Sequence, residues 1–161
     1  GRSIELECLD TPGHTMSHIC MLSHTEIPAL FSGDTLFNAG AGNCHNGGDP
    51  KKLYKTFTEQ LNRLPIETQI YPGHDYLTNN LKFTLDREPE NQTALKMLNK
   101  HKDEDPTKVV TTLKDEMSFN TFFRLQSPGV INKLRESFSD LEINPSPEAV
   151  FLKLRELRNH W

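Results

Sequence analysis

The sequence predicts an α/β fold in which strands and helices alternate over residues 1–87 and an all-helical module follows over residues 88–161. Two observations support this division. Short runs of alternating apolar residues, bounded by turn residues, occur only in the first part and are typical of strands. The second part has helical apolar periodicity and no convincing strand pattern.

Four strands are expected in the first part. In the first of them, Ile4, Leu6 and Cys8 alternate with glutamates, which would place the three side chains on one face of a sheet. Turn signals such as Thr11-Pro12-Gly13 separate the runs. The expected strands cover residues 4–9, 18–23, 28–32 and 68–71.

Two helices are expected between and after these strands. A Gly- and Asn-rich loop over residues 37–48 precedes the first helix, which begins at Asp49-Pro50 with an acidic N-cap and a proline at the first helical position. This helix is expected to stop at Pro65, and a second helix should cover residues 76–87. The apolar face of the first helix consists of Leu53, Phe57, Leu61 and Leu64.

The second part should contain only helices. They are expected over residues 91–102, after Thr112, and over residues 128–138 and 147–160. Thr112 and Asp115 have the spacing of a capping box. The last helix is expected to begin with Ser146 as its N-cap and Pro147 at its first position, and its apolar face consists of Val150, Leu154, Leu157 and Trp161.

The composition excludes several classes of protein. With 18 basic and 22 acidic residues the formal net charge is -4, so no basic field favours binding to nucleic acid. No run approaches the roughly 18 consecutive apolar residues of a membrane helix. Cys8, Cys20 and Cys44 are odd in number and widely spaced, which suggests neither a disulfide framework nor a zinc knuckle. A reducing, cytoplasmic compartment is therefore expected.

Three polar residues recur in one setting. His14 in TPGHT, Asp34 in SGDT and His74 in YPGHD each follow a predicted strand at a glycine-containing turn. Such strand ends present side chains to a shared sheet edge. Two imidazoles and a carboxylate can bind zinc, iron or manganese. A single histidine after a Pro-Gly turn is more often a surface or hydrogen-bonding residue, so the prediction depends on the three matching positions.

Several longer runs carry a family resemblance. LECLDTPGHTMSHIC, LFSGDTLF, YPGHDYLTNNLKF and LRELRNHW resemble the metallo-β-lactamase superfamily and, within it, glyoxalase II, the hydroxyacylglutathione hydrolases. The NTFFR run at residues 120–124 resembles the Asn-Pro-Phe-Leu-Arg stretch of that family. The resemblance implies that residues 1–87 form the second half of an αββα sandwich. It also implies that residues 88–161 form the substrate-binding helical module.

The resemblance also implies an activity. Members of this family hydrolyse the thioester S-D-lactoylglutathione to D-lactate and glutathione, in methylglyoxal detoxification, at a centre of two divalent ions. By this resemblance His14 would bind the first ion, Asp34 would bridge both, and His74 would bind the second; zinc is expected, with iron or manganese as alternatives. Water activated by the ions would attack the thioester, and the thiolate would leave without a cysteine nucleophile or strong acid assistance.

The same resemblance implies the substrate contacts. Tyr76 matches a tyrosine that contacts glutathione, and Arg155 and Arg158 match two basic positions that hold the glutathione carboxylates. Without the resemblance, the two arginines would be interpreted as part of a solvated basic face of the last helix. Asn43 and His45 stand where the family commonly has a basic and an aromatic residue. They could still donate hydrogen bonds, which leaves a different acyl-thiol open as the substrate.

One family motif is absent. The sequence has no HxHxDH, and His18 matches a position expected to be structural. The chain is therefore expected to be the C-terminal three-fifths of a longer hydrolase, with its N-terminal half as the missing partner. Each ion would keep two protein ligands, fewer than the three usual at catalytic zinc. The isolated chain should thus bind metal weakly, hydrolyse thioesters poorly and expose an apolar face.

Two other functions remain alternatives. A persulfide dioxygenase would use one iron ion on the same fold, although the paired C-terminal arginines speak against it. A catalytically inactive paralogue could act as an interaction module through its helices, but the retention of all three ligand positions argues against decay.

Overall fold

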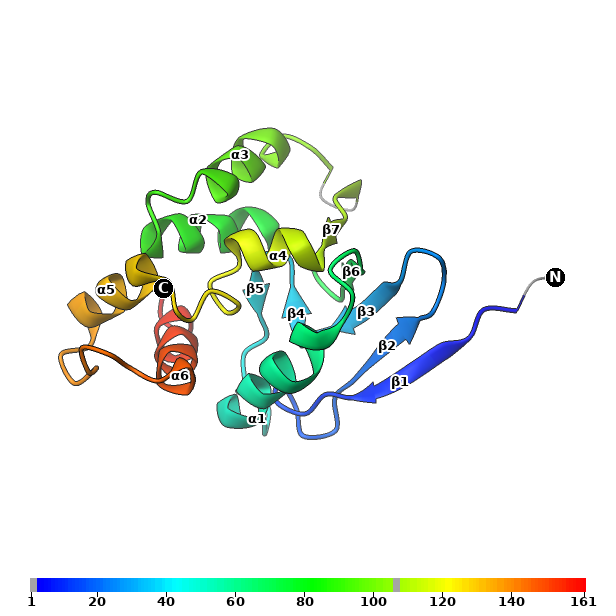
Figure 1. The fold of residues 1–161 in the computed structure, drawn as a ribbon, viewed down its shortest axis with the longest axis horizontal. Helices are drawn as coiled ribbons and strands as arrows, with labels where there is room; N and C mark the ends of the chain where they lie inside the picture. The colour runs from blue at the N-terminus through cyan, green and yellow to red at the C-terminus, as the bar shows by residue number, and fades with distance from the viewer. Residues whose placement is uncertain (1–2, 106–107) are drawn as a thin grey trace.

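The computed structural model describes residues 3–105 and 108–161, which are built around a five-stranded sheet in the order β1-β2-β3-β6-β7 (Figure 1). Neighbouring strands are antiparallel except β3 and β6, which are parallel. The four strands expected from the sequence are confirmed, and β7 is additional. The strands are β1 (Leu6–Asp10), β2 (Ile19–Ser23), β3 (Ala29–Gly33), β6 (Gln69–Pro72) and β7 (Thr111–Thr112).

The two faces of the sheet differ. On one face, alternate residues are buried in the core: Cys20, Leu22, Leu30 and Ile70. On the other face Met21 lies opposite Phe31, and Phe31 lies opposite Tyr71. These three side chains and Ile19 are between 36% and 52% exposed. The apolar surface expected from the sequence is therefore present on this sheet.

The helix expected over residues 49–65 has three parts, so the prediction of one regular helix was wrong. It begins as α1 (Pro50–Lys55), widens to a π-helical turn over Thr56–Gln60 and ends in a 3₁₀ turn over Leu61–Arg63. In an α-helix, residues four apart are rotated by about 40° from each other. The wider π-helical turn rotates each residue less and so offsets this rotation. Leu53, Phe57 and Leu61 therefore stay on one face, and all three are fully buried.

Three very short strands were not expected. The loop predicted over residues 37–48 begins with a hairpin of β4 (Leu36–Phe37) and β5 (Gly40–Ala41), with Ala39 at φ 58° between them. β7 lies in the part predicted to be all-helical and pairs with β6. Strands of two residues are too short to show alternation. The division of the chain at residue 87 stays a prediction.

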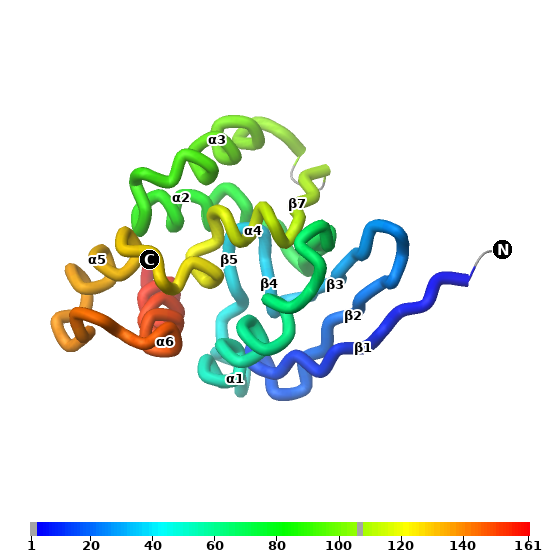
Figure 2. Tube along the Cα trace, in the orientation of Figure 1, coloured from blue at the N-terminus to red at the C-terminus, as the bar shows by residue number. Residues whose placement is uncertain are grey.

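The remaining helices gather at the end of the molecule away from β1 (Figure 2). The caps predicted from sequence are confirmed, because Ser146 accepts from the backbone of α6 and Thr112 forms a capping box with Asp115. No helix in the described part of the chain is long and apolar enough to cross a membrane. The helices are α2 (Leu77–Arg87), α3 (Gln92–His101), α4 (Leu113–Phe119), α5 (Pro128–Ser137) and α6 (Pro147–Arg158).

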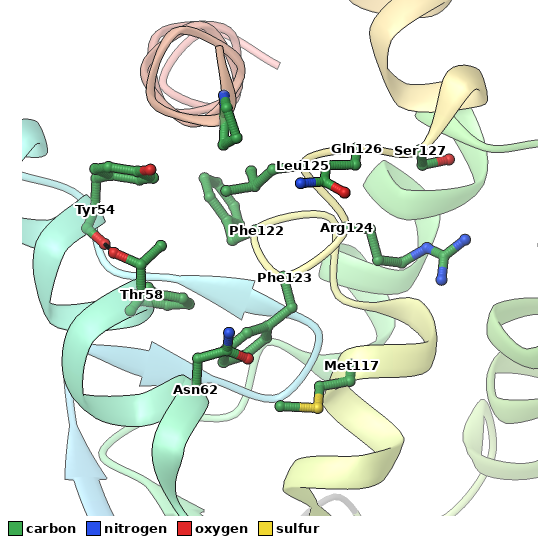
Figure 3. Close-up of a pocket in the computed structure, with 12 residues that line it drawn as sticks. Tyr54, Thr58, Asn62, Met117, Phe122, Phe123, Arg124, Leu125, Gln126 and Ser127 are labelled. Carbon is green, nitrogen blue, oxygen red and sulfur yellow. Dashed lines mark hydrogen bonds between the residues drawn. The ribbon is translucent and has the colours of Figure 1, made fainter.

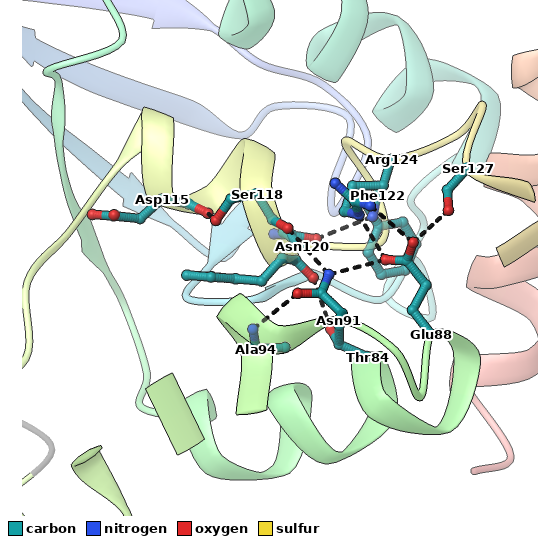
Figure 4. A network of polar contacts seen from close by, with 11 residues as sticks. Thr84, Glu88, Asn91, Ala94, Asp115, Ser118, Asn120, Phe122, Arg124 and Ser127 are labelled. Atoms are coloured by element: carbon teal, nitrogen blue, oxygen red, sulfur yellow. Dashed lines mark hydrogen bonds and ion pairs between the residues drawn. The ribbon is translucent and has the colours of Figure 1, made fainter. Parts of the chain in front are cut away.

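A buried acid joins the helices to the segment that follows α4 (Figure 4). Glu88, 6% exposed, accepts from Nε and Nη2 of Arg124 at 2.6 and 2.9 Å. Ser127 and Asn91 also donate to it. Although burial alone would raise it, these donors bring the pKa of Glu88 below its ordinary value. The network fixes the ends of α2 and α5 relative to each other.

Candidate metal centre and adjoining pocket

His14, Asp34 and His74 meet at one edge of the sheet. β1, β3 and β6 run in the same direction, because β1 and β3 are each antiparallel to β2 and β3 is parallel to β6. Each of the three residues follows one of these strands, so their side chains emerge at the same edge. The Nε2 atom of His14 lies 3.6 Å from Oδ2 of Asp34, and Nε2 of His74 lies 3.4 Å from Oδ1. The carboxylate thus lies between two imidazoles.

His14 is oriented as a metal ligand would be. Its Nδ1–H donates to the carbonyl of Asn43 at 2.7 Å, which leaves the lone pair of Nε2 facing Asp34. The His14 side chain is 13% exposed, whereas that of His74 is 57% exposed. The ring of His74 lies 5.7 Å from the ring of Tyr76.

The carboxylate of Asp34 fits a cation on both sides. Its Oδ1 atom is buried and has no hydrogen-bond partner within the described residues, a costly state for a charged oxygen. A divalent ion between this oxygen and His74, and another between Oδ2 and His14, would satisfy it. Across residues 3–105 and 108–161, no cluster of three or more His, Cys, Asp or Glu side chains could hold an ion alone. Each ion would therefore have two of its ligands here.

His18 holds the backbone of Asp34. The N–H of Asp34 donates to Nε2 of His18 at 3.1 Å, so the neutral ring carries its proton on Nδ1 and donates to Oγ1 of Thr35 at 2.9 Å. Burial lowers the pKa of His18, and His14 lowers it further, while Asp34 raises it. His18 therefore has the structural role that the sequence predicted.

Two glycines allow the close backbone contacts around the site. Gly13 in TPGHT, at φ +149°, lies so close to the backbone of Leu53 that a Cβ would come within 2.5 Å of its Cα. A Cβ on Gly42 would come within 1.8 Å of the carbonyl oxygen of Asp34. Larger residues would displace α1 or the segment after β5, and with it the ligands.

A pocket of about 280 Å³ brings together the five residues predicted to bind substrate. Its lining contains no acidic side chain, so the two guanidinium groups set its charge. The pocket adjoins the metal ligands, because Tyr76 neighbours His74. The predicted residues in the lining are Asn43, His45, Tyr76, Arg155 and Arg158.

The two arginines are used differently. Arg155 is 5% exposed, and its Nη1 donates to the carbonyls of Ala41 and Gly42 at 2.7 and 3.0 Å. Burial lowers its pKa to about 10. Arg158 donates to Oδ1 of Asn80 at 3.3 Å and lies over aromatic rings. Burial lowers its pKa as well.

Sequence reasoning missed some of the pocket. Asn80 and Asn159 also line it. Each stands four residues after a predicted site residue, Tyr76 or Arg155, and helical spacing alone could have placed it on the same face. Phe37, Ala41 and Asn79 line the pocket as well, and the ring of Phe37 packs edge-on against Tyr76 at 5.0 Å.

A separate cavity of about 500 Å³ lies between α1 with its π-helical extension and the segment after α4 (Figure 3). Its lining includes none of the metal or substrate residues. Arg124, which borders it, is already paired with Glu88. The aromatic rings that line this cavity are Tyr54, Phe57, Phe122 and Phe123.

Comparison with known proteins relates this chain to one family. Residues 75–161 match the family model described as hydroxyacylglutathione hydrolase C-terminus. The chain is 67% identical to the hydroxyacylglutathione hydrolase of Polaromonas sp. (strain JS666 / ATCC BAA-500) and 61% identical to that of Nitrosococcus oceani. Both alignments cover 100% of this chain but 62% of the relative. The chain therefore spans about three-fifths of their length.

Solved structures show the fold. ETHE1 from Myxococcus xanthus is 24% identical with a TM-score of 0.54, over 97% of this chain and 55% of that protein. A metallo-β-lactamase from Staphylococcus aureus subsp. aureus COL is 24% identical with a TM-score of 0.51, over 96% of this chain and 39% of that protein. The α/β fold predicted as part of a metallo-β-lactamase sandwich is confirmed.

Proposed function

We propose, on the premise that this chain belongs to the hydroxyacylglutathione hydrolase family, that it forms the C-terminal three-fifths of a thioester hydrolase. The substrates would be S-2-hydroxyacylglutathiones such as S-D-lactoylglutathione, and the role would be methylglyoxal detoxification. One observation carries the proposal: a carboxylate between two imidazoles adjoins a pocket with two arginines and no acid.

His14, Asp34 and His74 would hold two divalent ions, with zinc proposed ahead of iron and manganese. Such ions would supply Lewis-acid chemistry, acidifying water and polarising the thioester carbonyl. The chain's own groups prepare the site for this. Asn43 fixes the tautomer of His14, and His18 holds the backbone of Asp34. Because a thiolate is a good leaving group, no protonating side chain is needed.

The pocket would bind the glutathione part of the substrate. Glutathione carries two carboxylates, and Arg158 has several N–H groups without partners in the described structure that could donate to one of them. Tyr76 lines the same pocket as Arg158, and its ring lies 5.7 Å from the ring of His74, so it could contact the peptide. Asn43 and His45 would offer hydrogen bonds in place of a cation.

The remaining partner would be an N-terminal segment like that of the longer relatives. The exposed apolar face formed by Ile19, Met21, Phe31 and Tyr71 supports this, because a sheet with such a face is ordinarily covered. The same segment would complete the shells of the two ions. A reducing cytoplasmic location is also proposed, supported by three free cysteines.

In the test, the 161-residue chain is co-expressed with the N-terminal segment of the Polaromonas relative, and the assembled protein is supplied with Zn²⁺. The assembled protein should hydrolyse S-D-lactoylglutathione, whereas the chain alone should hydrolyse it poorly. The loss of thioester absorbance measures the rate in both cases. Arg158→Gln should raise KM about 10- to 100-fold, as expected for a lost charge-assisted hydrogen bond, with little change in kcat. Asp34→Asn should abolish turnover.

Lys153→Gln is the matched control, since Lys153 lies on the same helix but pairs with Asp140 away from the pocket. It should leave both constants unchanged. An assembled protein that ignores the thioester, or an R158Q variant with unchanged KM, would refute the proposal. Oxygen consumption with glutathione persulfide would instead support the dioxygenase alternative, and inactivity toward both compounds would support an interaction module.

A further inference from the structure

The segment 38–43 connects the helical module to the candidate metal ligand His14. Side chains on both sides of residue 87 hold its carbonyl groups: Asn80 on α2 donates to the first at 2.9 Å, and Asn120 in the module donates to the third at 3.1 Å. The last carbonyl belongs to Asn43 and accepts from Nδ1–H of His14. The position of this segment therefore determines whether His14 finds its acceptor.

Arg155 holds the part of the segment nearest to His14. Its Nη1 donates to both the fourth and the fifth carbonyl, those of Ala41 and Gly42, and its Nη2 donates to Asn159 at 3.1 Å. Within the described residues, no carboxylate pairs with this guanidinium. A buried cation without a counter-ion depends on such carbonyl dipoles for its solvation. The guanidinium and the two carbonyls therefore hold each other in place.

We propose that Arg155 is a positioning residue for the metal ligand His14, acting through the backbone of Ala41 and Gly42. The inference rests on the proposed function only in taking His14 as a metal ligand. Gly42 is bonded to Asn43, so movement of the Gly42 carbonyl rotates the peptide plane next to the acceptor of His14. Groups that orient a ligand in this way typically change metal affinity 10- to 100-fold when removed.

Arg158, on the same helix, is the arginine proposed to bind the substrate, and its contacts differ from those of Arg155. It makes one hydrogen bond to a side chain, to Asn80 at 3.3 Å, and lies over the rings of Phe83 and Trp161. Most of its five N–H groups stay available to the pocket. Arg155 has instead committed three N–H bonds to protein acceptors, and its Nε atom is buried without a partner within the described residues. Arg155 is therefore the arginine of this helix that directly holds backbone carbonyls of the segment 38–43.

The test reads the state of His14 directly. Long-range ¹H–¹⁵N spectra of histidine side chains are recorded for the metal-free 161-residue chain and for its Arg155→Met and Lys153→Gln variants, with His14 assigned from its loss in H14Q. The parent chain should show His14 in the Nδ1–H form with a slowly exchanging proton. R155M should lose that signal or show mixed tautomers, and K153Q should keep it, because Lys153 on the same helix pairs with Asp140.

A second readout is the visible absorbance of bound Co²⁺ during titration with Co²⁺ alone. The dissociation constant should rise about 10-fold or more in R155M and stay within twofold of the parent value in K153Q. Neither measurement contains a thioester, so a failure of the proposed hydrolase activity leaves both readings unaffected.

The proposal is overturned if R155M keeps both the His14 signal and the parent affinity for Co²⁺. If circular dichroism shows that R155M does not fold, Arg155→Lys decides, because its single nitrogen cannot reproduce the planar guanidinium contacts. Partial loss of the His14 proton signal in R155K supports the proposal, and an unchanged signal overturns it.

Discussion

Glu116 gives this chain an unusual dependence of stability on pH. The side chain is fully buried on α4 and accepts from Oγ1 of Thr111 at 2.7 Å, the N–H of Ala39 at 2.8 Å and Nδ2 of Asn120 at 2.9 Å. Burial raises the pKa of Glu116 from 4.5 to about 7, although these donors lower it. The informative change is Glu116→Gln, which keeps the size of the side chain but removes its titration.

The magnitude and sign follow from linkage. One pKa unit corresponds to about 1.4 kcal/mol, so a rise from 4.5 to about 7 corresponds to about 3 kcal/mol of folding free energy. The folded state favours the protonated acid. The stabilisation from Glu116 is therefore fully present below about pH 4.5 and is lost as the pH rises through about 7. The E116Q variant does not lose stability in this way, because glutamine does not titrate.

Urea unfolding followed by circular dichroism, between pH 4.5 and 8, measures the effect. The free energy of unfolding of the parent chain minus that of E116Q should fall by about 3 kcal/mol across this range. Any hydrogen bonds lost in the glutamine variant shift the difference by a constant and leave its slope unchanged. Glu136→Gln is the control, because this exposed acid is paired only with Lys133 in the described structure. A difference that stays constant with pH for E116Q would refute the reasoning.

Three further substitutions test a buried ion pair, the packing of the core and a helix N-cap. Arg124→Met strips two donors from buried Glu88 and should cost about 3–5 kcal/mol in urea unfolding at pH 7. Because the pKa of Glu88 is lowered, this cost should shrink as the pH falls through that lowered pKa, and a pH-independent cost would contradict it. Phe151→Ala removes a fully buried ring and should cost about 3–5 kcal/mol, seen as a lower Tm; a cost below about 1 kcal/mol would mean that the site collapses. Asp49→Ala should cost about 1 kcal/mol and Asp49→Asn much less, and equal costs would show that the N-cap acceptor is unimportant.

The sequence was most informative where a local rule acts alone. Alternation at Ile4, Leu6 and Cys8 predicted a strand, although β1 begins at Leu6. The cap at Ser146 was found because an N-cap needs only the residues around it. Strand ends at glycine turns predicted that His14 and Asp34 would lie close together, since parallel directions send them to one sheet edge.

Features set by distant contacts could not be read in this way. The hairpin of β4 and β5 is held from a distance, since Ala39 at its turn donates its N–H to Glu116, a residue 77 positions later. The burial of Arg155 depends on carbonyls more than 110 residues earlier in the chain. From the sequence alone, its position next to Arg158 on one helix suggested two equivalent groups. Only packing distinguishes them.

The continuity of the apolar core has a consequence for how the chain comes apart. A single cluster of buried side chains includes Leu30 of the sheet, Phe57 of the π-helical turn and Leu154 of α6. Melting either region would expose the apolar surface of the other, which ties their folding into one cooperative unit. A cut at residue 87 would therefore release two partly unfolded pieces. The helical module would therefore be a fixed part of the structure around the candidate metal site, and it could not be removed while the rest of the chain stays folded.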